Sequence, residues 1–162
     1  MQNHTIKLKI TEFSKKGNGI GHLHRDNAST LKVEVPFSIP EDTVEATIIR
    51  KRHGVGTAKL KEVITAAPNR INSKCAHFGI CGGCRWQQLS YEDQLCIKEN
   101  IVRKHFETLQ PELRINPIIP CESPWQYRNK MEFSFSSDAA RNKYLGLIID
   151  SSKGKVLNLT EC

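Results

Sequence analysis

The first 65 residues carry the pattern that most narrows the choice of fold, a series of short segments in which apolar and polar residues alternate. In "IKLKITEF" (6–13), Ile6, Leu8 and Ile10 alternate with polar residues, which is the period-2 pattern of a half-buried strand. The later segments "LKVEVPF", "DTVEATIIR" and "GTAKLKEVI" are short, rich in Val, Ile and Thr, and bounded by Gly, Pro or Asp. Five strands of this kind predict a small closed barrel of the OB type, because closure removes exposed sheet edges.

The segment "SKKGNGIGHL" (14–23) contains three glycines and is predicted to be a flexible turn. It does not match the pattern of a phosphate-binding P-loop. Its cations can contact a nucleic-acid backbone, or they can simply be solvated. Three of its residues are therefore candidate RNA contacts: Lys15, Lys16 and His22.

The composition suits a cytoplasmic protein that binds a polyanion. The 162 residues carry a formal net charge of +7, which favours RNA or DNA as a partner, although a well-solvated basic surface would look the same. No signal peptide and no membrane-spanning apolar run is apparent. In a reducing compartment, clustered cysteines such as those of residues 75–84 are expected to bind metal or do chemistry rather than form disulfides.

The polar stretch "TAAPNRINSK" (65–74) predicts a boundary between a domain over 1–67 and a second over 68–162. In the second, a helix is expected over 90–109, with Ser90 and Asp93 forming a capping box and Pro111 stopping it. Cys96 is predicted to be a small core residue of this helix. The helix has an apolar stripe formed by Tyr91, Leu95, Val102, Phe106 and Leu109.

A strand is predicted in "QYRNKMEFSFS" (126–136), with one face feeding a core and Arg128, Asn129 and Lys130 offered to RNA. Trp125 and Tyr127 are expected to anchor that core. Two more strands are expected in "KYLGLIID" and "GKVLNL". The predicted fold class is thus mainly β with one long helix: an OB-like barrel followed by a small α+β region.

The segment "KCAHFGICGGCRWQ" (74–87) places Cys75, Cys81 and Cys84 in a C-x5-C-x2-C pattern. A single C-x2-C knuckle leaves a zinc site incomplete, so a fourth ligand must come from His77 or from a distant thiol. The same pattern suits a [4Fe–4S] cluster, around which the Gly82–Gly83 pair could wrap closely. A redox pair of Cys81 and Cys84 is a third reading. The spacing leaves all three open. Trp86, beside these cysteines, could stack on a base or pack over a bound metal group.

Four stretches, in order, resemble the start of a bacterial iron–sulfur RNA uracil-5-methyltransferase that acts on 23S ribosomal RNA. Residues from about 4 to 67, with "GNGIGHL", "VEVPFSIPEDTVEATI" and "AKLKEVI", resemble a TRAM domain. "RINSKCAHFGICGGCRWQQLSYEDQLCIKENIV" resembles the cluster loop and its following helix, and "SPWQYRNKMEFSFS" the opening of the central RNA-binding region. "YLGLIIDSSKGKVLNLTEC" resembles the segment that ends in a remote cysteine.

The resemblance implies a [4Fe–4S] cluster on Cys75, Cys81, Cys84 and Cys162 that organises a platform for single-stranded or looped RNA. It implies that methyl transfer from S-adenosylmethionine to C5 of a uridine belongs to a C-terminal domain that would follow Cys162. No catalytic residue is therefore expected in this chain, which should be inactive alone and monomeric. The exposed helix stripe would otherwise pack on that domain, and its exposure could promote self-association. A stand-alone RNA-binding module and a zinc-stabilised nucleic-acid-binding protein are the alternative functions.

Overall fold

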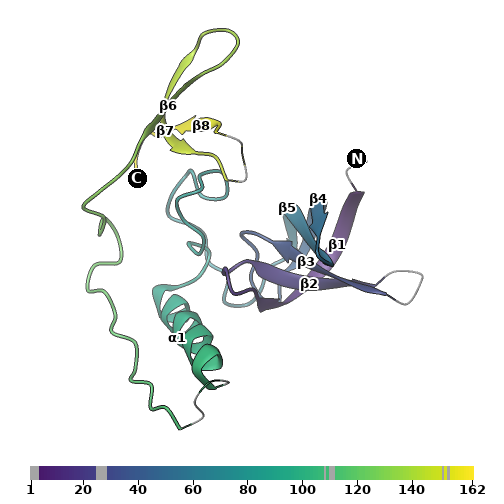
Figure 1. The fold of residues 1–162 in the computed structure, drawn as a ribbon. Coiled ribbons are helices and arrows are strands. Elements are labelled where there is room, and N and C mark those ends of the chain that lie inside the picture. Colours follow the sequence, from purple (N-terminus) through teal and green to yellow (C-terminus); the bar gives the residue numbers. More distant parts are fainter. Residues whose placement is uncertain (1–3, 25–28, 108, 110–111, 151, 153) are drawn as a thin grey trace. The chain divides into compact units, whose positions relative to one another are not determined.

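A computed structural model describes residues 4–24, 29–107, 109, 112–150, 152 and 154–162 (Figure 1). The chain divides into two compact units, Met1–Ile71 and Asn72–Cys162. Among the helices of the described residues, none is long and apolar enough to cross a membrane. As predicted, the structure is mainly β with a single helix.

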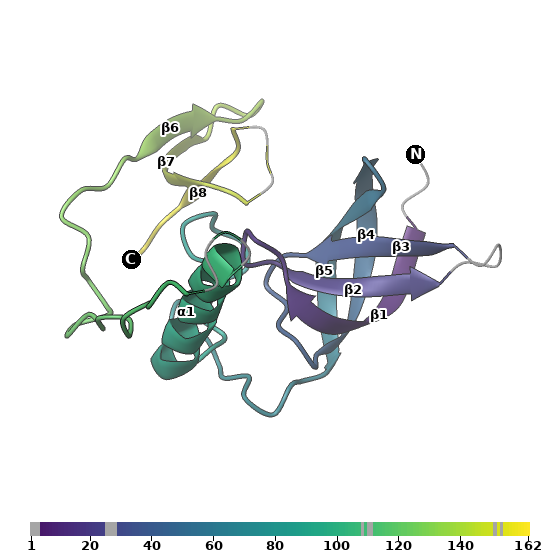
Figure 2. The ribbon, with the colours of Figure 1, turned by 60° about the horizontal axis from the view of Figure 1, so that its bottom comes forward.

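The first unit is a closed barrel of five strands. The strands are β1 (His4–Phe13), β2 (Gly19–His24), β3 (Thr30–Val35), β4 (Thr43–Arg52) and β5 (Val55–Thr65). They are hydrogen-bonded in the order β1-β2-β3-β5-β4, and the barrel closes where β4 pairs with β1 (Figure 2). All pairings are antiparallel except β3 with β5. This is the predicted OB-like architecture.

The alternation of apolar and polar residues fills the inside of the barrel. On β1, Ile6, Leu8 and Ile10 are buried, whereas the intervening Lys7 and Lys9 are exposed. The other strands contribute equivalent side chains to the same cluster: Leu31, Val33, Val35, Val44, Ala46, Ile48 and Ala58. The barrel thus has a continuous apolar core of its own.

The glycine-rich segment after β1 differs from the prediction, because only its first part is a turn. Ser14 organises that turn by accepting hydrogen bonds at its Oγ from the backbone N–H groups of Lys16 and Asn18 (3.3 and 3.1 Å). From Gly19 onward the chain is strand β2. A Cβ at Gly21 would lie 2.5 Å from the Leu8 Cγ, so this glycine serves close packing of two strands.

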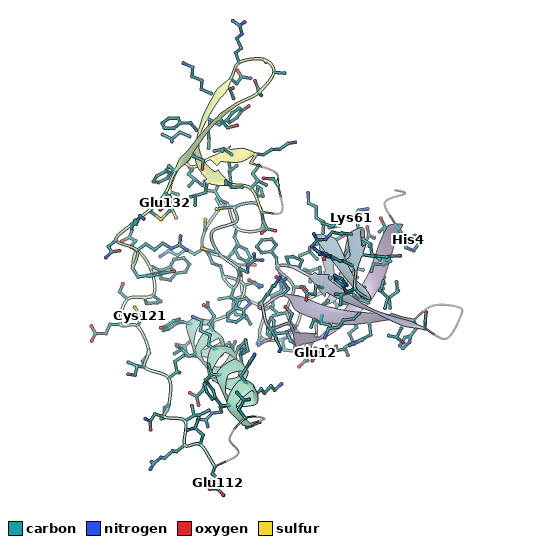
Figure 3. All side chains as sticks on the ribbon, in the orientation of Figure 1. His4, Glu12, Lys61, Glu112, Cys121 and Glu132 are labelled. Atoms are coloured by element: carbon teal, nitrogen blue, oxygen red, sulfur yellow. The ribbon has the colours of Figure 1, made fainter. Side chains whose placement is uncertain are left out.

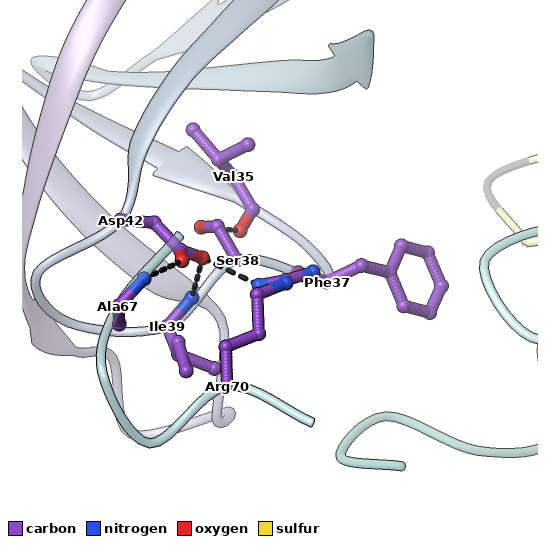
Figure 4. Close-up of polar contacts among 7 residues, drawn as sticks. All are labelled: Val35, Phe37, Ser38, Ile39, Asp42, Ala67 and Arg70. Carbon is purple, nitrogen blue, oxygen red and sulfur yellow. Dashed lines mark hydrogen bonds and ion pairs between the residues drawn. The ribbon is translucent and has the colours of Figure 1, made fainter. Parts of the chain in front are cut away.

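A buried carboxylate fastens the chain that leaves the barrel (Figure 4). Asp42, fully buried, accepts hydrogen bonds from the backbone N–H groups of Ile39 (2.9 Å) and Ala67 (3.0 Å) and forms an ion pair with Arg70. The Arg70 guanidinium also donates to the Phe37 carbonyl (3.2 Å). Residues just beyond β5 are therefore tied to the turn between β3 and β4.

The second unit contains helix α1 (Tyr91–Glu107) and strands β6 (Ser134–Ser137), β7 (Lys143–Ile148) and β8 (Val156–Asn158). The Ser90 Oγ accepts the Asp93 N–H (3.1 Å), as the capping prediction requires. The helix ends at Glu107, earlier than predicted; the expected stop at Pro111 lies outside the described residues. The three strands form an antiparallel sheet in the order β6-β7-β8.

Polar contacts join α1 to the irregular segment that follows it. The Glu99 carboxylate accepts the Ile118 N–H (2.9 Å) and pairs with Arg103 (2.7 Å), which lowers the pKa of Glu99. The Tyr91 hydroxyl accepts the Cys121 N–H (2.7 Å), and Cys121 is labelled on this segment in Figure 3. No residue of the described helix is fully buried, although Leu95, Ile97 and Ile101 are half-buried, so these polar contacts add to a limited apolar contact.

Three predictions about the second unit are wrong for one physical reason. The strand expected over 126–136 begins only at Ser134, and the anchors Trp125 and Tyr127 are 44% and 66% exposed. Cys96, expected in a core, is exposed on α1. Their spacing in the sequence fits a strand or a helix with one apolar face. Within the described residues, however, no second layer packs against that face.

Candidate metal centre and nucleic-acid interface

The cysteine-rich loop is folded by its own backbone hydrogen bonds. The Phe78 N–H donates to the Cys75 carbonyl (3.1 Å), and the Cys81 N–H donates to the His77 carbonyl (2.9 Å). The Gln87 side chain closes the loop by accepting the Cys75 N–H (3.0 Å). Two cysteines six positions apart are thereby held on one compact turn.

Two sulfurs in this loop accept backbone hydrogen bonds. The Gly83 N–H donates to the Cys81 Sγ (3.3 Å), and the His77 N–H donates to the Cys75 Sγ (3.4 Å). A Cβ at Gly83 would lie 3.4 Å from that same Cys81 sulfur. N–H groups aimed at sulfur are the outer contacts that tune metal–thiolate sites.

The loop lies against the end of β7, far along the chain. Cys81 forms an isolated antiparallel bridge with Ile149, and the Gly82 N–H donates to the Ile148 carbonyl (3.1 Å). A Cβ at Gly82 would be 3.1 Å from that carbonyl oxygen, tighter than most such contacts. The glycine between the cysteines therefore allows the loop to approach a distant strand.

The last residues of the chain are also brought to the loop. The His77 Nε2 lies 3.2 Å from the Thr160 Oγ1, and the Thr160 N–H also points at this nitrogen (3.4 Å). Thr160 is two residues from Cys162. His77, an alternative ligand in the sequence, thus contacts the segment that contains Cys162.

Among the four cysteines named by the family resemblance, Cys81 has a pKa above the ordinary value of a thiol. Burial raises the pKa of the Cys81 thiol, the Gly83 N–H lowers it, and the charges of Cys84, Cys162 and Cys75 each raise it further. All six cysteines are free thiols. Within the described residues, no three His, Cys, Asp or Glu side chains stand as a group that could hold a metal ion.

Arg128 lies at the same loop and not on a strand face. Its Nη2 donates to the Gly83 carbonyl (3.1 Å). The hydrogen bond with the Tyr127 hydroxyl raises the pKa of Arg128, and the charges of Cys84 and Cys162 add to this effect. The residue predicted to contact RNA is therefore a cation placed beside the thiols.

A hollow of about 410 Å³ opens between this loop and the sheet. Gly82, Gly83 and Arg128 line one side, and Glu132 and Ser134 lie on the chain leading into β6 (Glu132 is labelled in Figure 3). Nearby, Asn129 and Lys130 are exposed, and Lys130 pairs with Glu132 (2.7 Å). Trp86 is half-buried, and its carbonyl accepts the Gln94 side-chain N–H (3.0 Å).

The barrel candidates separate into two groups. Lys15 and Lys16 are exposed on the β1–β2 turn, next to the strand pair Gly19 and Val35. His22 is exposed farther along β2, opposite Lys32. A basic run, Arg50–His53, lies at the end of β4 and was not predicted as a contact. The run "RKRHG" between two strand patterns indicates it in the sequence.

No family model matches the chain. Curated proteins do: it is 47% identical over 131 residues to an uncharacterized RNA methyltransferase of Protochlamydia amoebophila, a match covering 80% of this chain and 29% of that protein. It is 36% identical over 157 residues to the 23S rRNA (uracil(747)-C(5))-methyltransferase of Pyrococcus horikoshii, covering 97% and 33%. It is 35% identical over 128 residues to the 23S rRNA (uracil(1939)-C(5))-methyltransferase of Alkalilimnicola ehrlichii, covering 77% and 27%.

A solved structure shares the fold. The Pyrococcus abyssi tRNA (uracil-54, C5)-methyltransferase, in complex with S-adenosyl-L-homocysteine, matches with a TM-score of 0.62 at 20% identity, covering 96% of this chain and 32% of that one. The chain thus spans about a third of the length of the proteins it matches.

Proposed function

Since this chain is a homologue of RNA uracil-5-methyltransferases, we propose that it is the RNA-recognition and iron–sulfur part of a S-adenosylmethionine-dependent enzyme that methylates C5 of a uridine in 23S ribosomal RNA. The proposed substrate is a single-stranded or looped region. We assign methyl transfer and S-adenosylmethionine binding to a part of the longer relatives that this chain does not match. The chain would contribute affinity and orientation, and it would act as a monomer in the cytoplasm.

The hydrogen-bonded cysteine loop, together with the His77–Thr160 contact that brings the segment of Cys162 to it, is the observation that supports the iron–sulfur assignment. We propose Cys75, Cys81, Cys84 and Cys162 as the four ligands, because a [4Fe–4S] cluster requires four thiolates. Free thiols, N–H groups directed at two of the sulfurs, and a glycine pair between two ligands all suit that group. When bound, the cluster would link residues 75–84 covalently to the end of the chain.

The remaining candidates give the RNA-contacting residues of this proposal. In the second unit these are Arg128, Asn129, Lys130 and Trp86, and in the barrel they are Lys15, Lys16 and His22. A guanidinium beside a glycine-lined hollow can bind a phosphate while one of its N–H groups stays on the Gly83 carbonyl. Since cations supply much of the affinity, binding should weaken strongly with salt.

Metal and acid-labile sulfide analysis of the anaerobically purified chain tests the proposal, together with its visible spectrum. About four irons and four sulfides per chain with a broad brown absorbance are expected. Cys81→Ser should lose this signal, whereas Cys121→Ser should keep it. One zinc ion in a colourless solution would overturn the cluster and favour a zinc-stabilised nucleic-acid-binding protein.

A further inference from the structure

The end of β4 and the turn that leads to β5 carry a run of cations. Arg50, Lys51, Arg52 and His53 are consecutive and all exposed. His53 and Gly54 have positive φ values of 48° and 76°, as in the tight two-residue turns of β-hairpins. The short turn fixes the direction of both strands, so the basic side chains are presented by a rigid scaffold.

Strand register extends this turn into a row across four strands. His22 on β2 is opposite Lys32 on β3, Lys32 is opposite Val55 on β5, and Val55 is opposite Arg52 on β4. His22 is fully outward, and Lys32 and Val55 are half-exposed. Neighbouring strands lie about 4.8 Å apart, so the row is roughly 14 Å long. That length can reach more than one phosphate of an extended single strand.

The cations at the end of β4 are not neutralised by ion pairs within the described residues. Among the residues that the structure describes, Arg50, Lys51 and Arg52 have no acidic partner within 4.0 Å. Lys32 pairs with Glu12 at 3.5 Å, but both side chains are about half exposed, and such pairs are weak. Removing it from Glu12 therefore costs little.

The other end of the same face carries charges of both signs, because Glu12 and Glu34 lie beside the exposed Lys15 and Lys16. Glu34 lies two positions along β3 from Lys32 and accepts a hydrogen bond from the Asn18 side chain (3.1 Å), next to the Lys15–Lys16 turn. Glu12 lies near that end of β1, opposite Ile20. Carboxylates thus offset the lysines at this end, whereas the cations at the end of β4 have no such partners among the described residues, so a polyanion is attracted more strongly to the end of β4.

We infer that the row of His22, Lys32 and Arg52, with Arg50 beside it on the same face of β4, is a phosphate-binding surface that holds a single RNA strand across β2, β3, β5 and β4. We call it the cationic row. The inference rests on the proposed function for its ligand and adds where on the barrel the strand lies. It favours His22 over the Lys15–Lys16 turn as the barrel contact.

Paired charge removals in the full chain test this inference. Arg50→Gln/Arg52→Gln removes two charges from the cationic row. The control, Lys59→Gln/Lys61→Gln, removes two exposed charges from β5 beyond its pairing with β3, where Lys61 instead pairs with Glu45 (3.4 Å). The probe is a fluorescein-labelled single-stranded RNA 12-mer of mixed sequence, followed by anisotropy between 50 and 200 mM salt.

The row variant is expected to bind more than about tenfold more weakly at 100 mM salt, and the slope of log affinity against log salt should fall by about 1.4 for two lost phosphate contacts. The control should change less than about twofold. Equal losses in both variants would mean that binding follows net charge and would overturn the inference. So would binding to phosphatidylserine vesicles in place of RNA.

The same titration separates this inference from the proposed function. An unaltered chain that binds no RNA contradicts both. An unaltered chain that binds RNA, with undiminished binding in the row variant, contradicts the inference alone. Circular dichroism checks that the exposed substitutions leave the barrel folded.

Discussion

The barrel and the second unit are stabilised in different ways. The barrel buries a continuous cluster of aliphatic side chains from β1, β3, β4 and β5, and Leu23 of β2 packs against this cluster. Among the described residues of the second unit, Leu89 and Val156 are the buried large aliphatic side chains, while Phe133 and Phe135 are 51% and 84% exposed. Ordering a residue costs about 1–2 kcal/mol of backbone entropy, which apolar burial must offset. The second unit therefore depends more on polar contacts and, in our proposal, on thiolate–metal bonds.

The largest expected effect on this comparison comes from removing the thiol of Cys162. Cys162→Ser should abolish the proposed cluster, and amide hydrogen exchange should then become more than about tenfold faster across residues 72–162, because little apolar burial protects them. Exchange in β1–β5 should not change. Cys121→Ser is the matched control. Unchanged protection in the second unit would show that its order does not come from the cysteines.

A second test is directed at the barrel. Asp42→Ala leaves the half-buried Arg70 without its carboxylate partner. It also removes the acceptor of the Ile39 and Ala67 backbone N–H groups. Removing one member of such a pair costs about 3–5 kcal/mol, measurable as a lower urea midpoint for the barrel. Glu45→Ala, which breaks an exposed pair with Lys61, should cost about 0–1 kcal/mol. Equal effects would mean that the buried carboxylate does not fasten the barrel.

The smallest test concerns the β6–β7 hairpin. Hydrogen bonds from the Asn142 side chain, the Tyr144 hydroxyl and the Asn142 backbone lower the pKa of Asp138. A lowered folded pKa gives stability that is present above the unfolded value of about 3.9 and lost as pH falls through the folded value. NMR shifts of Asn142 and Tyr144 should therefore move toward unfolded values below about pH 4, while barrel shifts stay constant.

Asp138→Asn should give similar hairpin shifts already at pH 7, since the amide cannot carry the charge that the three donors favour. Unchanged shifts in this variant would mean that the Asp138 contacts do not order the hairpin.

Period-2 alternation predicted the barrel because closure supplied the inner face that the pattern anticipates. The same alternation misled at 126–136, where Tyr127 and Phe133 have no layer to face within the described chain. Local signals worked where the structure is local, as at the Ser90 cap. They failed at Gly19–His24, where glycines serve strand packing and not a turn.

The candidate site shows the same limit. Spacing alone grouped Cys75, Cys81 and Cys84, since one loop holds them. Cys162 was proposed as the fourth ligand only from the family resemblance. Its segment contacts the loop through His77 and Thr160, which are too far apart in the sequence for a local pattern to connect them. The basic turn at Arg50–His53 could have been predicted from its letters, but its alignment with His22 and Lys32 depends on the β3–β5 register.

The pairing of β1 with β4, which closes the barrel, has a consequence for the rate of folding. Local hairpins such as β2–β3 and β4–β5 can form early, but β1 must meet β4 across the chain, as Lys7 does with Glu45, before the core is enclosed. Loop-closure entropy delays such non-local contacts, and barrels dominated by them fold in milliseconds to seconds. During that interval β1 and β4 both expose free edges, so a newly made chain passes through a stage at which it can pair with a neighbour.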